Sequence, residues 1–260
     1  MFYKKDGVYF SDILTCPHGF SCREGGVSTH THTASMNLAF GRGDDDATVI
    51  ENLSIFAGKL GIDEKSIISV PQIHSCDVRA VGEEQAGMGY FREAEFSCDG
   101  YVTREKGVAI GVKTADCVPI LLYDPVSSVI GALHAGWRGS TAGIALAGLE
   151  KMISLGAKAQ NIRAAIGAAI GKCCYEVGED VYNAARENLG EDIADRFIMP
   201  SGDKYRADLK GLNAALLVQG GVLPENIDIS EHCTACESGE FFSHRATGGL
   251  RGTMLSVISL

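Results

Sequence analysis

Three short segments of the 260-residue chain place a histidine or a cysteine where an apolar run meets a turn. They contain His74 in PQIHS, Cys117 in KTADCVPILLYD and His134 in LHAGWRGS. Two imidazoles and a thiolate suit zinc, and a catalytic zinc site keeps its fourth position for water or substrate. The spacing does not resemble a zinc finger, so a strand-end histidine and a small core cysteine remain an alternative interpretation.

The same residues allow a second chemistry. Cys117 could be a nucleophile with His134 or His74 as its base, which would make the protein a thiol hydrolase. Asp116 is either an acid–base partner of this group or an aspartate that caps a turn. Zinc binding and nucleophilic activation both require a thiolate, so the residue types leave both interpretations open.

Other cysteines give weaker signals. The chain has nine, and its N-terminus shows no apolar stretch followed by a cleavage site, so we expect reduced thiols and a cytoplasmic protein. Cys233 and Cys236 form a single CxxC, and Cys173 and Cys174 are adjacent. A lone CxxC is weak, so we expect two reduced cysteines in a turn and ordinary packing for the adjacent pair.

Charge and composition exclude several classes of protein. A net charge of −10 argues against a nucleic-acid backbone as the main partner, because clustered Lys and Arg carry such binding. No apolar run is long enough to cross a bilayer, so no membrane partner is expected. With 45% hydrophobic and 22% charged residues the chain is typical of globular proteins. We expect one domain over residues 1–260, present as a monomer.

Short apolar runs alternate with helix-like segments, and no linker divides them. Helices are expected at 44–60, 140–155 with Ser140 as its N-cap, 178–188 and 209–219. Strands are expected at 67–70, 78–81, 101–103, 108–112, 118–123, 129–133, 162–166 and 253–260. This mixed order, with several adjacent strands, favours α+β layers over a regular βαβ array.

Several blocks in order resemble the YfiH family, labelled polyphenol oxidase or laccase-domain proteins and linked to purine nucleoside metabolism. Besides the three segments above, the blocks are HGFSCREGGVS at 18–28, SMNLAF at 35–40, DGYVT at 99–103 and IGAAIGKCCYEVGEDV at 166–181. The resemblance implies an α+β fold, a layered α/β–β/α sandwich with mixed β-sheets in a single domain. It also implies metal ligation by His74, Cys117 and His134.

The resemblance implies a zinc-dependent purine nucleoside phosphorylase acting on adenosine, inosine and S-methyl-5′-thioadenosine, with adenosine deaminase activity. The expected partners are purine nucleosides and inorganic phosphate. Arg23 and Arg138 are candidates for phosphate, because a guanidinium offers paired donors to oxyanions, and Asn37 for ribose or base. The alternatives are a copper-dependent polyphenol oxidase, the Cys117 hydrolase and a metal-binding protein without turnover. Laccases need several copper ions held by histidine, and seven histidines are few for that; copper is the alternative occupant of the zinc site.

Overall fold

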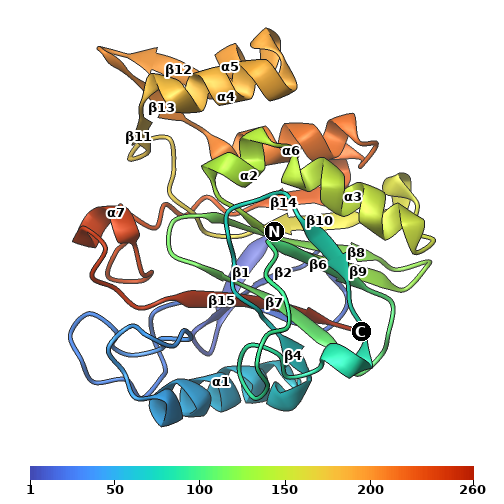
Figure 1. Cartoon of the computed structure of the whole chain (residues 1–260), viewed down its shortest axis with the longest axis vertical. Helices are drawn as coiled ribbons and strands as arrows, with labels where there is room; N and C mark the ends of the chain where they lie inside the picture. The colour runs from blue at the N-terminus through green and yellow to red at the C-terminus, as the bar shows by residue number, and fades with distance from the viewer.

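Two six-stranded mixed sheets form the centre of the computed structural model, which describes residues 1–260 (Figure 1). The first sheet has the order β1 (Phe2–Lys5), β2 (Val8–Ser11), β3 (His18–Ser21), β15 (Met254–Ser259), β7 (Ala109–Thr114) and β4 (Ile67–Ile68). The second has the order β14 (Ile227–Ile229), β10 (Arg163–Ile166), β8 (Val118–Asp124), β9 (Val129–Ala135), β6 (Gly100–Thr103) and β5 (Val78–Ala80). In each sheet, parallel pairing occurs only at edge strands: β4 with β7, and β14 and β5 with their neighbours.

The two sheets share a buried apolar layer. Side chains alternate along a strand, so every second residue of β7 and β9 faces this layer. Ile110 and Val112 of the first sheet lie in one buried cluster with Leu121 and Ile130 of the second. The remaining positions of each strand face outward and require cover from helices.

Helices provide that cover on both outer faces (Figure 1). Below the first sheet, α1 (Asp46–Leu60) buries Leu53 and Phe56 with Leu255 and Val257 of β15. The second sheet is covered by α2 (Trp137–Thr141), α3 (Ile144–Ser154) and α6 (Leu209–Gln219). The layers therefore run helix, sheet, sheet, helix, and the expected α+β sandwich is confirmed.

A smaller unit extends beyond the second helical layer. It consists of a three-stranded sheet, β11 (Glu176–Val177), β13 (Lys204–Ala207) and β12 (Ile198–Ser201), with α4 (Glu179–Leu189) and α5 (Glu191–Phe197). A last short helix, α7 (His244–Thr247), precedes β15. None of the helices combines the length and the apolar character that crossing a membrane would require.

One expected helix was wrong. Residues 140–155 do not form a single helix capped by Ser140; α2 ends at Thr141 and α3 begins at Ile144. Gly143 separates them with φ of 82°, a left-handed conformation that breaks an α-helix and that glycine adopts without strain. Ser140 instead lies buried within α2, where the amide of Asn213 donates to its hydroxyl.

Tyr101 connects this core to the loop that carries His74. Its ring is fully buried between the sheets, and its hydroxyl accepts a hydrogen bond from the Val70 N–H at 2.8 Å. Val70 is the last buried residue before the exposed Pro71. The hydroxyl therefore anchors the start of the loop in the core.

We expect Tyr101→Phe to lower the free energy of unfolding by about 1–3 kcal/mol, because the buried Val70 N–H would lose its acceptor. Urea denaturation measures this change. Tyr3→Phe is the matched control, since Tyr3 is 47% exposed and its loss of a hydroxyl should change stability by less than about 0.5 kcal/mol. Equal stabilities of the two variants would contradict the anchoring role.

Candidate metal centre

His74, Cys117 and His134 come together in space. One potential ligand atom from each lies within 4.8 Å of the other two. Cys117 Sγ is 3.9 Å from His74 Nε2, and the two imidazole rings are 4.9 Å apart in an edge-to-face arrangement. His134 is buried, Cys117 is partly buried and His74 is exposed, so the group opens to solvent on the His74 side.

The chain crosses between the two sheets at two of these residues. His74 lies on the connection from β4 in the first sheet to β5 in the second, and Cys117 on the connection from β7 to β8. Both connections are tight: His74 has φ of 60°, and Asp116, next to Cys117, has φ of 94°. Non-glycine residues with positive φ are uncommon and often mark functional sites.

Gly136 allows the two crossings to approach β9. A Cβ at this position would stand 2.8 Å from His74 Cδ2 and 3.3 Å from Cys117 Sγ. Any side chain here would push apart two of the three ligand residues. Gly136 therefore has a steric role in the site, because it leaves the space that His74 and Cys117 occupy.

The carboxylate of Asp99 links the loop that carries His74 to the side chain of His134. Its carboxylate is fully buried and accepts hydrogen bonds from the backbone N–H groups of His74 at 2.9 Å and Ser75 at 2.7 Å, and from the Ser75 hydroxyl. It also lies 2.8 Å from His134 Nδ1. Burial opposes ionisation, but the bonds from His134 and Ser75 outweigh it and lower the pKa of Asp99 to about 2. An ionised carboxylate thus directs His134 Nε2 towards Cys117.

Charges within the group favour a thiolate. Burial opposes ionisation of Cys117, but the charge of His134 and the hydrogen bonds from both histidines lower its pKa to about 6. Burial also opposes protonation of His134, yet the Cys117 thiolate and Asp99 raise its pKa to about 9. Both shifts favour a thiolate beside an imidazolium, and a metal ion would take the place of the proton between them.

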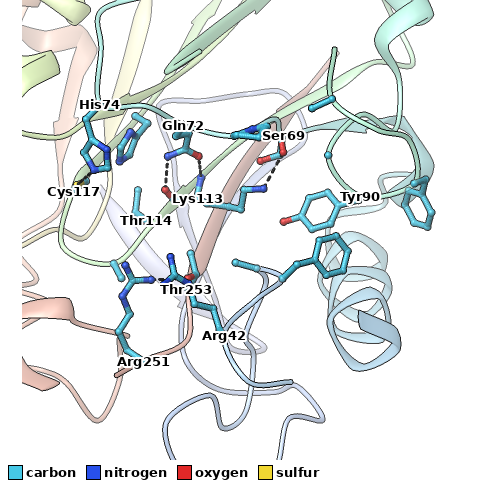
Figure 2. Close-up of a pocket in the computed structure, with 18 of the residues that line it drawn as sticks. Arg42, Ser69, Gln72, His74, Tyr90, Lys113, Thr114, Cys117, Arg251 and Thr253 are labelled. Carbon is cyan, nitrogen blue, oxygen red and sulfur yellow. Dashed lines mark hydrogen bonds between the residues drawn. The ribbon is translucent and has the colours of Figure 1, made fainter. Parts of the chain in front are cut away.

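The three residues line one end of a cavity of about 730 Å³ (Figure 2). Its other end is aromatic, with Phe40, Tyr90 and Phe91. The cations of the wall are Arg42, Arg92, Lys113 and Arg251, against one carboxylate, Glu93. A cavity with excess positive charge in a protein of net charge −10 indicates an anionic ligand.

Lys113 is held in the wall by neighbouring groups. Gln72 pairs with both its backbone N–H and its C=O at 2.7 Å (Figure 2). Its ammonium donates to the Ser69 carbonyl at 2.9 Å and lies over the Tyr90 ring. Burial lowers the pKa of the ammonium to about 8.

Arg251 has an unused donor. Its Nη1 donates to the Thr253 hydroxyl at 2.7 Å, while its buried Nε has no partner in the protein. Burial, followed by the nearby charge of Arg42, lowers the pKa of this guanidinium. Two mutually repelling guanidinium groups with a free donor form a site that an oxyanion would stabilise.

Comparisons with known proteins show which family the chain belongs to. Residues 17–260 match the family described as multi-copper polyphenol oxidoreductase laccase. The computed structure superposes on the crystal structure of the Bacillus licheniformis hypothetical protein YfiH with a TM-score of 0.93, at 33% identity and covering 100% of this chain and 98% of that one. The chain belongs to the laccase-like YfiH family.

Two relatives of this YfiH-family chain have names that state an activity. It is 37% identical to adenosine deaminase RL5 from an unknown prokaryotic organism, over 92% of each chain. It is 35% identical to purine nucleoside phosphorylase YlmD of Geobacillus stearothermophilus, over 92% of this chain and 88% of that one. The crystal structure of that YlmD superposes with a TM-score of 0.92, over 99% of this chain and 98% of that one.

The other site residues expected from the sequence do not line the cavity of this YfiH-family protein. Arg23 donates to the carbonyls of Thr31, Ala34 and Ser238. Arg138 is exposed and lies over the ring of Trp137, 4.1 Å from its centroid.

Asn37 and Asp116 lie in supporting positions. Asn37 is fully buried, and its Oδ1 accepts from the N–H of Thr253, a cavity residue. The Asp116 carboxylate accepts from the Thr234 hydroxyl at 2.6 Å and from the Arg245 N–H at 2.7 Å. These contacts fix the turn that presents Cys117.

Sequence reasoning missed Asp99, Arg42, Lys113 and Arg251. Asp99 opens the DGYVT block, so its position before a buried strand was a signal. Lys113 is a charged residue between the apolar Val112 and the buried Thr114, which was also a signal. Arg42 and Arg251 gave none, because only the fold brings the two ends of the sequence together.

We expect Asp99→Asn to weaken metal binding about 10- to 100-fold, because the neutral amide no longer holds His134 with a charged acceptor. Competition with a chromophoric chelator measures the affinity. Asp77→Asn, on the loop that carries His74, is the control, since its carboxylate pairs with Arg79 at 2.9 Å. Unchanged affinity in a folded Asp99→Asn protein would remove Asp99 from the site.

Proposed function

We propose that this protein is a zinc-dependent purine nucleoside phosphorylase that also deaminates adenosine. The observation that carries the proposal is the His74–Cys117–His134 group at one end of a cationic cavity in an acidic protein. The volume of about 730 Å³ lies within the range of small-ligand sites. The names of two relatives, a phosphorylase and a deaminase, support both activities.

The donor set fits zinc. A thiolate with two imidazoles matches the ligands of catalytic zinc sites, and the Asp99–His134 pair matches the carboxylate–histidine arrangement behind such ligands. His74, Cys117 and His134 would hold the ion. When bound, zinc supplies Lewis-acid chemistry, polarising a substrate group or lowering the pKa of a water molecule.

Copper oxidase chemistry is less well supported. A multicopper site needs several clusters of histidine ligands. Among the three groups of potential ligands in the fold, only the His74–Cys117–His134 group contains histidine. We therefore propose zinc as the resident metal, with copper as a competitor for the same ligands.

Phosphorolysis requires phosphate beside the ribose. We assign phosphate to Lys113, Arg251 and Arg42, which all line the cavity. In the reaction a phosphate oxygen forms a bond to C1′, the C1′–N bond breaks, and the purine leaves with the bonding electrons and takes up a proton. Fixed cations hold the anionic nucleophile near the sugar and lower the entropic part of the barrier.

One orientation of the nucleoside serves both reactions. With the purine towards His74 and the ribose over Lys113, the leaving base and C6 of adenine both lie at the metal end. The 5′ position then faces Phe40 and Phe91, and an apolar methylthio group would fit there. This orientation accounts for adenosine, inosine and S-methyl-5′-thioadenosine in a single site.

The thiol-hydrolase alternative keeps one supporting observation. The lowered pKa of Cys117 beside His134 describes an activated nucleophile in the absence of metal. A thiol hydrolase would have no specific need for the cations that line the cavity. We further propose that residues 1–260 act as one catalytic domain and as a monomer, because the three potential metal ligands and four cations of one cavity come from the same chain.

The test is product analysis with metal-quantified protein. Adenosine, inosine and S-methyl-5′-thioadenosine are each incubated with and without phosphate, and products are followed by chromatography. We expect phosphate-dependent release of free base and phosphate-independent conversion of adenosine to inosine. Cys117→Ala should lose both activities together with the zinc of this centre.

Cys76→Ala is the matched control, an exposed cysteine two residues from His74, and should retain activity. Absence of turnover in folded, zinc-loaded protein would reject the nucleoside proposal. A covalent adduct on Cys117 with amide or ester substrates would favour the hydrolase instead.

Lys113 should give phosphate binding a pH dependence. With a pKa of about 8, its ammonium is charged below that pH and neutral above it, so the KM for phosphate should rise as the pH increases through 8. We expect Lys113→Met to raise this KM roughly tenfold at pH 7 and to abolish the rise. Steady-state kinetics from pH 6.5 to about 9 test this. Lys106→Met, an exposed lysine, should keep the wild-type profile; the same profile in Lys113→Met would exclude Lys113.

A further inference from the structure

Four cysteines that the sequence analysis assigned to a turn and to ordinary packing meet at a second place in the fold. Cys173 and Cys174 follow β10, and Cys233 and Cys236 follow β14. Their four sulfur atoms all lie within 4.8 Å of one another. The CxxC therefore has the partner pair that the sequence alone did not reveal.

The distances fit one metal ion better than a disulfide. Cys236 Sγ is 3.5 Å from Cys173 Sγ and 3.2 Å from Cys174 Sγ, whereas a disulfide joins sulfurs at about 2.05 Å. Four thiolates bound to one zinc ion at about 2.3 Å stand about 3.8 Å from one another. An iron–sulfur cluster with several iron atoms would hold the four sulfurs farther apart.

Both turns present their cysteines as metal-binding turns do. The N–H of Cys174 donates to the Gly171 carbonyl at 2.9 Å, and the N–H of Glu237 donates to the Cys233 carbonyl at 3.0 Å. The Gly171 N–H points at Cys233 Sγ at 3.2 Å.

The residues around the sulfurs leave them room and supply positive charge. A Cβ on Gly171 would stand 3.1 Å from Cys173 Sγ and 3.4 Å from Cys233 Sγ. The Arg206 guanidinium donates to the Cys173 carbonyl, and the buried Lys210 ammonium donates to the His232 carbonyl beside Cys233. The positive charges of Arg206 and Lys210 would partly offset the two negative charges of a zinc ion bound by four thiolates.

We propose that Cys173, Cys174, Cys233 and Cys236 form a structural tetrathiolate site for one zinc ion, separate from the nucleoside cavity. All four positions of the ion are filled by protein ligands, which is typical of structural zinc. The site ties the segment after β10 to the segment after β14.

The site also supports the candidate metal centre. Thr234, between Cys233 and Cys236, donates to the Asp116 carboxylate at 2.6 Å, and the Ile170 N–H donates to the Asp116 carbonyl at 2.9 Å. Asp116 precedes Cys117. The turn that carries Cys117 is thus held by both of the segments that the zinc ion would join.

The test uses full-length His74→Ala protein, in which the other metal centre is impaired. Its zinc content is measured by mass spectrometry after removal of free metal, and cobalt is then substituted for zinc. We expect about one zinc ion per chain and the visible and near-ultraviolet bands of a tetrathiolate cobalt site. Adding Cys236→Ser should abolish both, whereas adding Cys76→Ser, an exposed cysteine outside the cluster, should change neither.

A second measurement needs no substitution in the cluster. In folded wild-type protein, the four thiols should resist alkylation until a chelator is added, as peptide mapping would show. Absence of zinc in folded His74→Ala protein would overturn the proposal. The proposal would also be overturned by a Cys174–Cys236 disulfide in protein prepared in reducing buffer, by free alkylation of all four thiols, or by an iron chromophore.

Discussion

The buried carboxylate of Asp99 binds two parts of the chain that would otherwise move independently. It accepts hydrogen bonds from backbone N–H groups of the loop that carries His74, and it also contacts the ring of His134 on β9. A fully buried carboxylate is costly unless every lone pair is used, so its position leaves little freedom to either histidine. The relative placement of the two histidines follows from this one interaction.

The electrostatic organisation separates the two proposed metal sites. At the cavity, Arg251 has a buried Nε without a partner, and Arg42 and Lys113 line the same wall. At the four cysteines, Arg206 and Lys210 donate to carbonyls of the same turns and are committed to the protein. The cavity therefore suits an anion that binds and dissociates, whereas the four-cysteine cluster suits a metal ion that stays bound.

The sequence predicted those elements whose signals are local. The expected helix at 209–219 coincides with α6, because Asp208 caps its first turn through the Gly211 N–H. The break at Gly143 was missed because the apolar pattern continues across it. The strands β1 to β3 were missed as well, since they are four residues each and join the sheet only because β3 pairs with β15, at the other end of the chain.

The candidate site likewise contains residues that the sequence could predict and residues that it could not. His74, Cys117 and His134 could be selected because strand ends and family blocks mark them, and the fold brings them together. Arg23 and Arg138 were reasonable phosphate ligands by chemistry alone, yet Arg23 donates to three backbone carbonyls and Arg138 lies over Trp137. Which arginine faces a cavity depends on tertiary packing.

Two of the three ligand residues of the metal centre lie where the chain passes from one sheet to the other. A metal ion bound there has its full affinity only while the two sheets remain docked. By thermodynamic linkage, the ion must favour that docking by the same free energy with which docking favours the ion. A metal ion bound there would therefore hold the two sheets together, and any motion that separates the sheets would also be a route for metal release.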